Sequence, residues 1–169
     1  SIMIQVAFPV RKNFTVTLER TKENATFELG GKWRFLREKT DGSMPVSAAL
    51  YAGTDWATAE NIFGSTSSSR TDGERFAFFA QLPVTKQISS KLSAAVVPGI
   101  LLNGNVLIPE DDPLVTLGLA GKFSLGRRYA IFSEIVPVLA GEGTAAPVFV
   151  NGKTFYDTFT AGLEIKAGG

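Results

Sequence analysis

Apolar and polar residues alternate along most of this chain. The alternation is clearest from Thr154 to Lys166, where one parity is apolar: Phe155, Phe159, Ala161, Leu163 and Ile165. The other parity carries Thr, Tyr, Gly, Glu and Lys side chains. A β-strand projects successive side chains to opposite faces of its sheet, so this pattern predicts a strand with one apolar and one polar face.

The same pattern, in stronger or weaker form, recurs in about nine segments and predicts an all-β fold. These segments are Ile2–Phe8, Phe14–Arg20, Thr26–Arg37, Pro45–Thr54, Glu74–Pro83, Leu92–Leu101, Leu114–Phe123, Tyr129–Leu139 and Thr154–Lys166. Most are about 9–12 residues long, which suits strands that cross a bilayer at a tilt. The longest uncharged stretch contains Pro98 and the turn-forming Asn103-Gly104-Asn105, so we expect no transmembrane helix.

The connections between these segments alternate in length. Short connections contain the residues 11–13, 38–42, 85–90 and 126–128, and several of them are basic. Longer polar connections cover residues 55–73, 103–113 and 141–153. Successive connections of an antiparallel meander lie at opposite ends, so one end receives short turns and the other long loops. This asymmetry is typical of outer-membrane barrels.

Aromatic residues form two groups along the predicted strands. One group lies near the short turns: Phe8, Phe14, Trp33, Phe35, Phe123 and Tyr129. The other group lies near the long loops: Phe27, Trp56, Phe76 and Phe155. Two aromatic bands that flank an aliphatic middle indicate the interfacial girdles of a membrane barrel.

Alternation alone does not distinguish a membrane barrel from a soluble lipid-binding barrel, whose apolar face points inward. Uniform strand length and asymmetric connections favour the membrane alternative. So does the polar parity, which is rich in small residues that suit a crowded lumen: Gly30, Ser47, Ala49, Thr116, Gly118, Ala120, Thr160 and Gly162.

Composition narrows the possible functions. The chain has 17 Lys plus Arg and 16 Asp plus Glu, a net charge of +1 that offers no electrostatic reason to expect nucleic acid. It has 0 Cys and 0 His, which removes disulfides, thiolate zinc sites and His-dependent catalysis. We expect no enzyme activity, no cofactor and no metal site; the acidic Glu110-Asp111-Asp112 lacks the spacing of a calcium loop.

The charged residues of the polar parity are candidates to face a lumen: Glu28, Lys32, Arg34, Arg75, Lys122, Glu134, Glu164 and Lys166. They either set which solutes pass or pair across strands and plug the interior. The candidates to face lipid are Phe27, Leu29, Trp33, Phe35, Val115, Leu117, Leu119, Phe159 and Leu163. Asp157 departs from this pattern because it shares the parity of Phe159, near the long-loop end where a charge costs little.

Six segments, read in order, resemble a bacterial family known as a membrane-bound β-barrel domain of unknown function (the family numbered five-seven-seven-seven). They are SIMIQVAF (1–8), KNFTVTLER (12–20), ATFELGGKWRFLR (25–37), MPVSAALY (44–51), LGLAGKF (117–123) and FYDTFTAGLEIKAGG (155–169). The resemblance spans the whole chain and implies an outer-membrane barrel of roughly 12 strands. It implies no activity.

Together these observations predict an antiparallel up-and-down transmembrane β-barrel, with about nine of its strands in this chain. We expect one domain over residues 1–169, incomplete at both ends, in the outer membrane of a Gram-negative bacterium. Its expected partners are the lipid bilayer, lipopolysaccharide and other envelope proteins. The expected function is a pore or transport barrel; the alternatives are a structural barrel that anchors or partners an envelope assembly, and a soluble lipid-binding barrel.

Overall fold

Thirteen β-strands make up the regular structure of the described residues in the computed structural model. The structure describes residues 3–21, 25–58, 75–104, 113–126, 128–141, 148–150, 153–155 and 157–165. The strands are β1 (Met3–Arg11), β2 (Phe14–Thr21), β3 (Thr26–Leu36), β4 (Ser47–Ala57), β5 (Phe76–Gln81), β6 (Val84–Gln87), β7 (Leu92–Leu102), β8 (Leu114–Ser124), β9 (Tyr129–Val136), β10 (Val138–Ala140), β11 (Val148–Val150), β12 (Lys153–Phe155) and β13 (Thr158–Ile165). Within those residues, no helix has the length and apolar character needed to cross a membrane.

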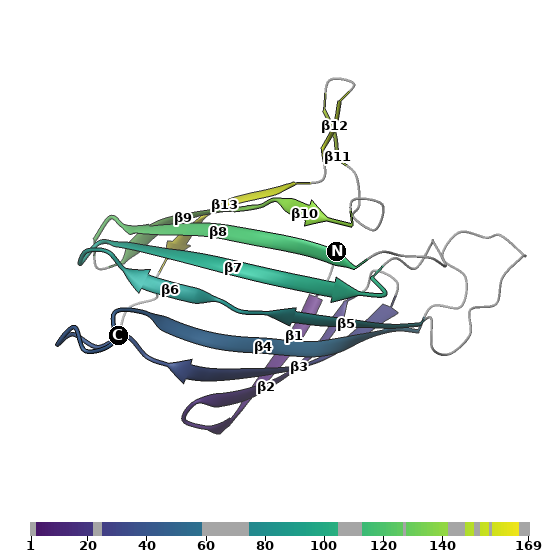
Figure 1. The fold of residues 1–169 in the computed structure, drawn as a ribbon, viewed down its shortest axis with the longest axis horizontal. Coiled ribbons are helices and arrows are strands. Elements are labelled where there is room, and N and C mark those ends of the chain that lie inside the picture. Colours follow the sequence, from purple (N-terminus) through teal and green to yellow (C-terminus); the bar gives the residue numbers. More distant parts are fainter. Residues whose placement is uncertain are drawn as a thin grey trace, which may run out of the picture.

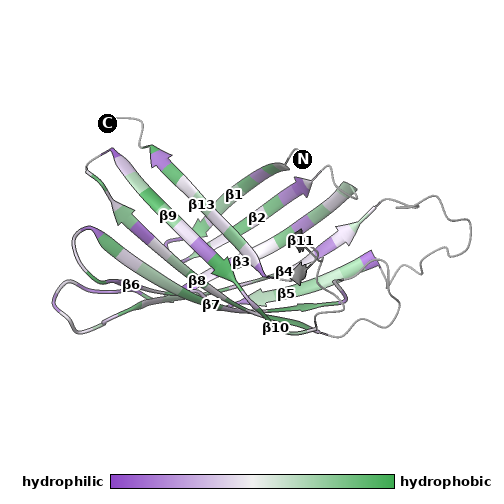
Figure 2. Cartoon of the chain, turned by 90° about the horizontal axis from the view of Figure 1, so that it is seen from above, coloured by the Kyte–Doolittle hydropathy of each residue, from purple (hydrophilic) through white to green (hydrophobic). Residues whose placement is uncertain are grey.

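Eleven of these strands form one antiparallel sheet, in the order β1-β2-β3-β4-β5-β7-β8-β9-β13 with β6 and β10 beside this path. Neighbours in the sheet follow one another along the chain except at β9 and β13, between which β10 and the β11–β12 hairpin occur, and all pairs are antiparallel, which confirms the antiparallel all-β prediction (Figure 1). Figure 2 shows the sheet curved into a trough, with both edge strands, β1 and β13, on the same side of β7. The two edges are not paired with each other among the described residues, so closure of the barrel stays a prediction.

The main sheet has eleven strands, two more than the nine predicted segments, because the extra strand β6 follows Pro83 at the end of the predicted Glu74–Pro83 and Pro137 divides the predicted Tyr129–Leu139. β5 and β6 both lie between β4 and β7 and are separated at Leu82-Pro83, and Pro137 separates β9 from β10. Proline has no N–H to donate to a neighbouring strand. The proline carbonyls still accept across the sheet, from the N–H of Ala49 to Pro83 at 3.1 Å and from that of Leu117 to Pro137 at 3.1 Å.

Three boundaries differ from the sequence-based expectation. β6 occupies part of the predicted connection 85–90, because its residues pair with both β4 and β7. β11 lies inside the predicted loop 141–153 and pairs with β12, which begins at the last residue of that loop; this separate hairpin projects from the sheet in Figure 1. The predicted strand Thr154–Lys166 is therefore divided, because its first residues pair with β11 and its later ones with β9.

The register sorts the side chains of the whole sheet onto two faces. One row across β2, β3, β4, β5 and β7 holds Leu18, Leu29, Thr54, Phe78 and Leu102. The next row, on the opposite side, holds Gln5, Glu19, Glu28, Asp55 and Ala77. We call these sides the apolar face and the polar face.

A conventional hydrophobic core is absent from the described residues. Their buried apolar side chains are four alanines, Ala48, Ala49, Ala57 and Ala130, and no large side chain is fully buried. Nearly all of the large exposed apolar residues of the strands belong to the apolar face, where Phe159 reaches 72% exposure. A monomeric soluble protein rarely exposes such a continuous apolar surface, so this face requires an apolar environment.

The sheet curls towards its polar face. Tyr51 on β4 contacts Thr17 on β2, with 3.1 Å between the hydroxyl oxygens, and Lys122 on β8 forms an ion pair with Glu164 on β13. Each contact passes over an intervening strand, although strands two apart in a flat sheet are separated by about 9–10 Å. On the crowded polar face, aromatic rings occupy the space above glycines. A Cβ on Gly53 would lie 2.7 Å from Phe79 Cζ, and one on Gly162 would lie 2.4 Å from Phe132 Cζ.

The crowding can be measured with two glycine substitutions. A Cβ at Gly53 would also meet the Leu29 carbonyl oxygen at 2.3 Å, so Gly53→Ala should destabilise the protein by about 1–3 kcal/mol through overpacking. Gly121 has no neighbouring atom within 4 Å of its added Cβ. Gly121→Ala should therefore leave the stability unchanged or raise it by up to about 1 kcal/mol. Urea unfolding in lipid vesicles measures both free energies; equal effects would contradict the crowded concave surface.

Candidate functional site

An acidic row crosses the polar face from β1 to β4. Gln5, Glu19, Glu28 and Asp55 are successive partners in the register. The Gln5 side-chain amide donates a hydrogen bond to Glu19 Oε2 at 3.1 Å, and Glu19, Glu28 and Asp55 are half-buried. Three carboxylates side by side repel one another unless water, cations or protons screen them, so this row gives one wall of the trough a local negative charge.

Tyr51 holds Glu28 in place. Its hydroxyl donates a hydrogen bond to Glu28 Oε1 and also contacts Thr17 Oγ1. Because the single tyrosine proton points to the carboxylate, the Thr17 hydroxyl is the donor in the second bond. The Tyr51 ring lies over Gly30, where a Cβ would come within 2.6 Å of the phenolic oxygen. Gly30 thus creates the space that lets a β4 side chain reach β2 and β3 together.

Asp55 lies at the end of this row nearest the long connections. Its Oδ1 is buried without a hydrogen-bond partner, and so is Nε of Arg75, among the described residues. Arg75 lies one residue before β5, and Asp55 pairs with Ala77 two residues further on. Buried polar atoms without partners are costly in a dry interior, so this arrangement favours a hydrated trough at that level.

A second charged group lies on the other wall of the trough, across β8, β9 and β13. Lys122 and Glu164 form the ion pair described above, and each side chain keeps 38% exposure. Glu134 pairs with Ala120, which places it diagonally beside Lys122 on the same face. Its Oε1 lies 3.5 Å from the position that a Cβ on Gly118 would take. Positive and negative groups alternate on this wall, unlike the acidic row.

The predicted lumen residues are placed as follows. Glu28, Lys32, Arg34, Lys122, Glu134 and Glu164 occupy polar-face positions of the register. Lys32 and Arg34 are exposed near the short turns, and Arg34 Nη2 donates a 3.2 Å hydrogen bond to the Lys12 carbonyl oxygen. Lys166 lies outside the described residues, as does the acidic segment 110–112. Among the described strands β3 pairs with β2 and β4, so its charges are not cross-strand neighbours of those on β8 and β13.

Sequence reasoning missed Glu19, Tyr51 and Asp55. Glu19 and Tyr51 lie in segments that were predicted as strands but not divided into faces, and Asp55 lay just past a predicted strand end. The alternation of Thr15, Thr17 and Glu19 carries the signal that would have placed Glu19 on the polar face. No local signal places Tyr51 over Gly30, because that contact depends on the register between β3 and β4.

The predicted lipid-facing residues all share the apolar face. Leu29, Trp33, Phe35, Leu119, Phe159 and Leu163 are exposed. Phe27, Val115 and Leu117 lie on the same face but are half-buried among their neighbours. This surface has the side-chain composition of a lipid-facing barrel wall.

Aromatic rings line up on the apolar face at the long-connection end. Phe27, Trp56 and Phe76 are cross-strand partners on β3, β4 and β5, with ring centroids 6.2 Å and 6.1 Å apart. The Arg20 guanidinium lies 5.1 Å from the centre of the Phe27 ring and extends this row to β2. A row of aromatic rings with a cation at its end suits the headgroup region of a bilayer.

A second aromatic group lies at the short-turn end. The rings of Trp33 and Phe35 are 5.5 Å apart, and both are exposed on β3. Phe27 and Phe35 are separated by about 26 Å along β3 at about 3.3 Å per residue, comparable with the apolar band of a membrane barrel. The Phe155 side chain, predicted for the other band, lies outside the description.

The ends of the sheet carry defined polar contacts. In the turn after β3, the Ser43 backbone N–H and hydroxyl both donate to Asp41, and these hydrogen bonds lower the pKa of its carboxyl group. At the opposite end, Asp157 accepts a 3.2 Å hydrogen bond from the Val138 backbone N–H. Asp157, which departs from the strand pattern, thus binds the first residue of β10.

No group of three Asp or Glu side chains in the described residues is arranged to hold a metal ion.

Comparisons with known proteins agree with this geometry. A family model described as "Membrane bound beta barrel domain (DUF5777)" matches residues 1–169. No curated protein and no solved structure matches the chain.

The depth of the apolar face can be tested on β8 and its turn. Leu119 is 43% exposed in mid-strand, and Leu125 is 58% exposed just beyond the strand end. Leu119→Arg should cost about 2–4 kcal/mol in a bilayer, and Leu125→Arg about 0–1 kcal/mol, because the cost of a charge falls towards the interface. Unfolding in phosphatidylcholine vesicles measures both. Equal costs at the two positions would contradict a lipid-facing β8.

The strength of the ion pair on the second wall tests how far solvent reaches into the trough. A double-mutant cycle with Lys122→Met and Glu164→Gln should give a coupling free energy of about 0.5–1 kcal/mol, because solvent screens partly exposed pairs. The coupling should fall further when the salt concentration is raised. Strictly additive single substitutions would show that the pair does not stabilise the fold.

Proposed function

This chain belongs to the family of membrane-bound β-barrel domains, and from that premise we propose that it is a non-catalytic pore or transport barrel of a bacterial outer membrane. Lipid and lipopolysaccharide would surround the apolar face, and solutes would pass along the polar face. The family is membrane bound, which sets aside the soluble lipid-binding alternative. The absence of His and Cys from the sequence supports a role without catalysis.

The separation of the two faces carries this proposal. Large apolar side chains lie exposed on one side of the sheet, and the acidic side chains of the sheet, together with Lys32, Arg34 and Lys122, lie on the concave side. A sheet that only binds hydrocarbon on one face needs no charges on its opposite face. A conducting interior does need charged walls, because they set which ions enter. The acidic row of Glu19, Glu28 and Asp55 would favour cations, and Lys32 would oppose them.

The short turns would face the periplasm in this proposal. Periplasmic turns of outer-membrane barrels are short, and the extracellular loops are longer. Here two residues join β1 to β2, at Lys12-Asn13, and four residues join both β6 to β7 and β8 to β9, whereas residues 37–46 make the β3–β4 connection the longest at this end. The connections at the opposite end of the sheet are mostly much longer, as between β4 and β5.

One observation favours the structural alternative, a plugged barrel that anchors or partners other envelope proteins. Several polar-face charges already have partners: Lys122 with Glu164, and Glu28 with Tyr51. Side chains bound to one another obstruct a lumen and leave less charge to act on solutes. The two alternatives differ in whether the interior conducts.

Conductance of the full-length protein in a planar bilayer separates them. We expect ohmic single-channel steps, and we expect Lys32→Glu to shift the reversal potential under a KCl gradient towards cation selectivity. Lys86→Glu is the matched control: it makes the same charge change on β6, at a position that the register assigns to the apolar parity. Because electrostatic effects decay within about 10 Å at 0.1 M salt, the control should change selectivity much less.

A silent bilayer, with protein insertion verified by protease protection, would reject the pore and support the structural alternative. Equal shifts for Lys32→Glu and Lys86→Glu would show that Lys32 does not line the conducting path.

A further inference from the structure

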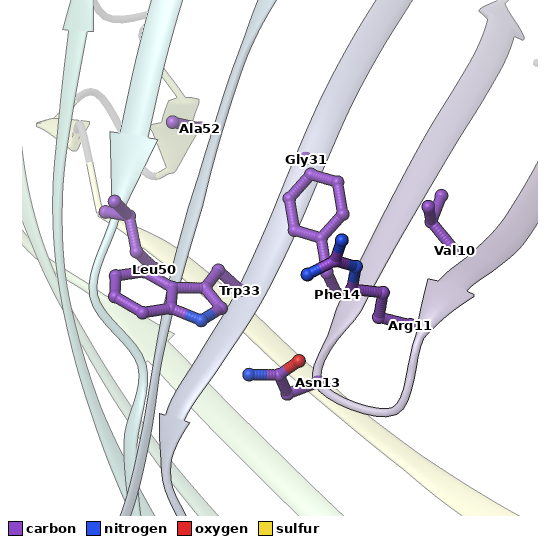
Figure 3. A pocket seen from close by; sticks show the side chains of 8 residues that line it. All are labelled: Val10, Arg11, Asn13, Phe14, Gly31, Trp33, Leu50 and Ala52. Atoms are coloured by element: carbon purple, nitrogen blue, oxygen red, sulfur yellow. The ribbon is translucent and has the colours of Figure 1, made fainter.

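The apolar face carries a groove of about 660 Å³ at its short-turn end. Phe14, Gly31, Trp33, Leu50 and Ala52 line it, together with Arg11, which is the cross-strand neighbour of Phe14 (Figure 3). The volume is in the range of ligand-binding clefts. The groove lies on the outer side of the sheet, separate from the charges of the polar face.

The register explains how the groove forms. Phe14, Trp33 and Leu50 are direct partners across β2, β3 and β4, so three large side chains stand in one row. Gly31 and Ala52, partners on β3 and β4, occupy the next row on the same face. Small residues behind large ones leave a depression in the surface.

Packing within the chain does not demand the glycine. A Cβ at Gly31 would meet the Phe14 ring at 3.5 Å and the Ala52 carbonyl oxygen at 3.9 Å, which are ordinary contacts. Gly31 differs in this respect from Gly30 and Gly53, whose added Cβ atoms would clash. Internal packing would thus accept an alanine at Gly31, and a larger side chain would extend into the groove beside the Phe14 ring.

The chemistry of the groove matches one kind of occupant. Its sides are hydrocarbon and aromatic rings, and Trp33 and Leu50 are exposed to the surroundings of the apolar face. Arg11 is the last residue of β1 and stands opposite Phe14 in the register, so a permanent positive charge marks the interfacial end of the groove. An apolar slot that ends at a guanidinium fits an acyl chain attached to an anionic phosphate headgroup.

We propose that this groove binds one acyl chain of an anionic glycerophospholipid, with its phosphate on Arg11. The chain lies between Phe14 and Trp33 over Gly31, and the headgroup remains at the level of the β1–β2 turn. Binding here requires that the apolar face meets lipid and is independent of whether the trough conducts. Failure of this proposal therefore leaves the conductance test unaffected, and the converse holds as well.

The two tryptophans of the sequence make the groove directly observable. Trp33 forms one side of the groove, and Trp56 belongs to the aromatic row at the opposite end of the apolar face. Trp56→Phe leaves Trp33 as the single reporter, and Trp33→Phe leaves Trp56 as the internal reference. The full-length variants are reconstituted in vesicles of phosphatidylcholine and phosphatidylglycerol in which either lipid carries dibrominated chains, which quench tryptophan fluorescence on contact.

Quenching at Trp33 should show a preference of about fivefold for phosphatidylglycerol over phosphatidylcholine, the effect of one arginine near the membrane surface. Because Arg20 lies over the Phe27 ring in the same aromatic row as Trp56, the reference is measured with Arg20→Gln added, and Trp56 should then show a preference closer to one. In the Trp33 background, Arg11→Gln should abolish the preference. Gly31→Leu, which fills the groove, should lower quenching by both lipids.

Two matched controls separate the groove from general effects. Arg128→Gln removes an arginine from the β8–β9 turn, which does not line the groove, and should preserve the preference. Gly121→Leu enlarges another apolar-face glycine with open space around it and should leave Trp33 quenching unchanged. Far-ultraviolet circular dichroism verifies that each variant retains its β-structure.

Three results would overturn the proposal. Equal lipid preferences at Trp33 and Trp56 would show that the groove does not select a headgroup. Loss of the preference in Arg128→Gln as well as Arg11→Gln would assign it to the general charge of the turns. Weak quenching of Trp33 by both lipids in the otherwise unchanged groove would mean that protein, such as a second copy of this chain, covers it.

Discussion

Hydrogen bonding between strands is the constraint on which the rest of this structure depends. Inside a bilayer no water is available to satisfy backbone N–H and C=O groups, so neighbouring strands must satisfy them. The sheet does this through a continuous antiparallel register from β1 to β13. That register fixes which side chains share a row, and thereby divides the molecule into an apolar face and a polar face. Lipid contact, charge clustering and the groove all follow from this division.

Curvature then gives the two faces different chemistry. On the concave polar face, side chains crowd, and rings such as Tyr51 and Phe132 lie over glycines. The same curvature lets Lys122 reach Glu164 across β9. On the convex apolar face the side chains spread apart, which leaves open space beside Gly31 and around Gly121. A glycine therefore marks a close approach on one face and a vacant surface on the other.

The candidate site was only partly accessible to sequence reasoning. Glu28, Lys122 and Glu164 are predictable because their alternation with Leu29, Phe123 and Leu163 is regular. Asp55 was missed because the pattern gives no clear end for β4. The hairpin of β11 and β12 was missed because short strands in a polar connection have too few alternating positions to be recognised.

The amino-acid sequence by itself determined the all-β class, the antiparallel meander and the identity of the two faces. Each of these features can be read locally: the period-2 alternation within a single strand, and the short connections within a single turn. The tertiary structure alone decided that Tyr51 bonds both Glu28 and Thr17, that Lys122 pairs with Glu164, and that a groove opens beside Arg11. Those contacts join strands that are separate in sequence, and they depend on register and curvature, which arise only when the whole sheet is assembled.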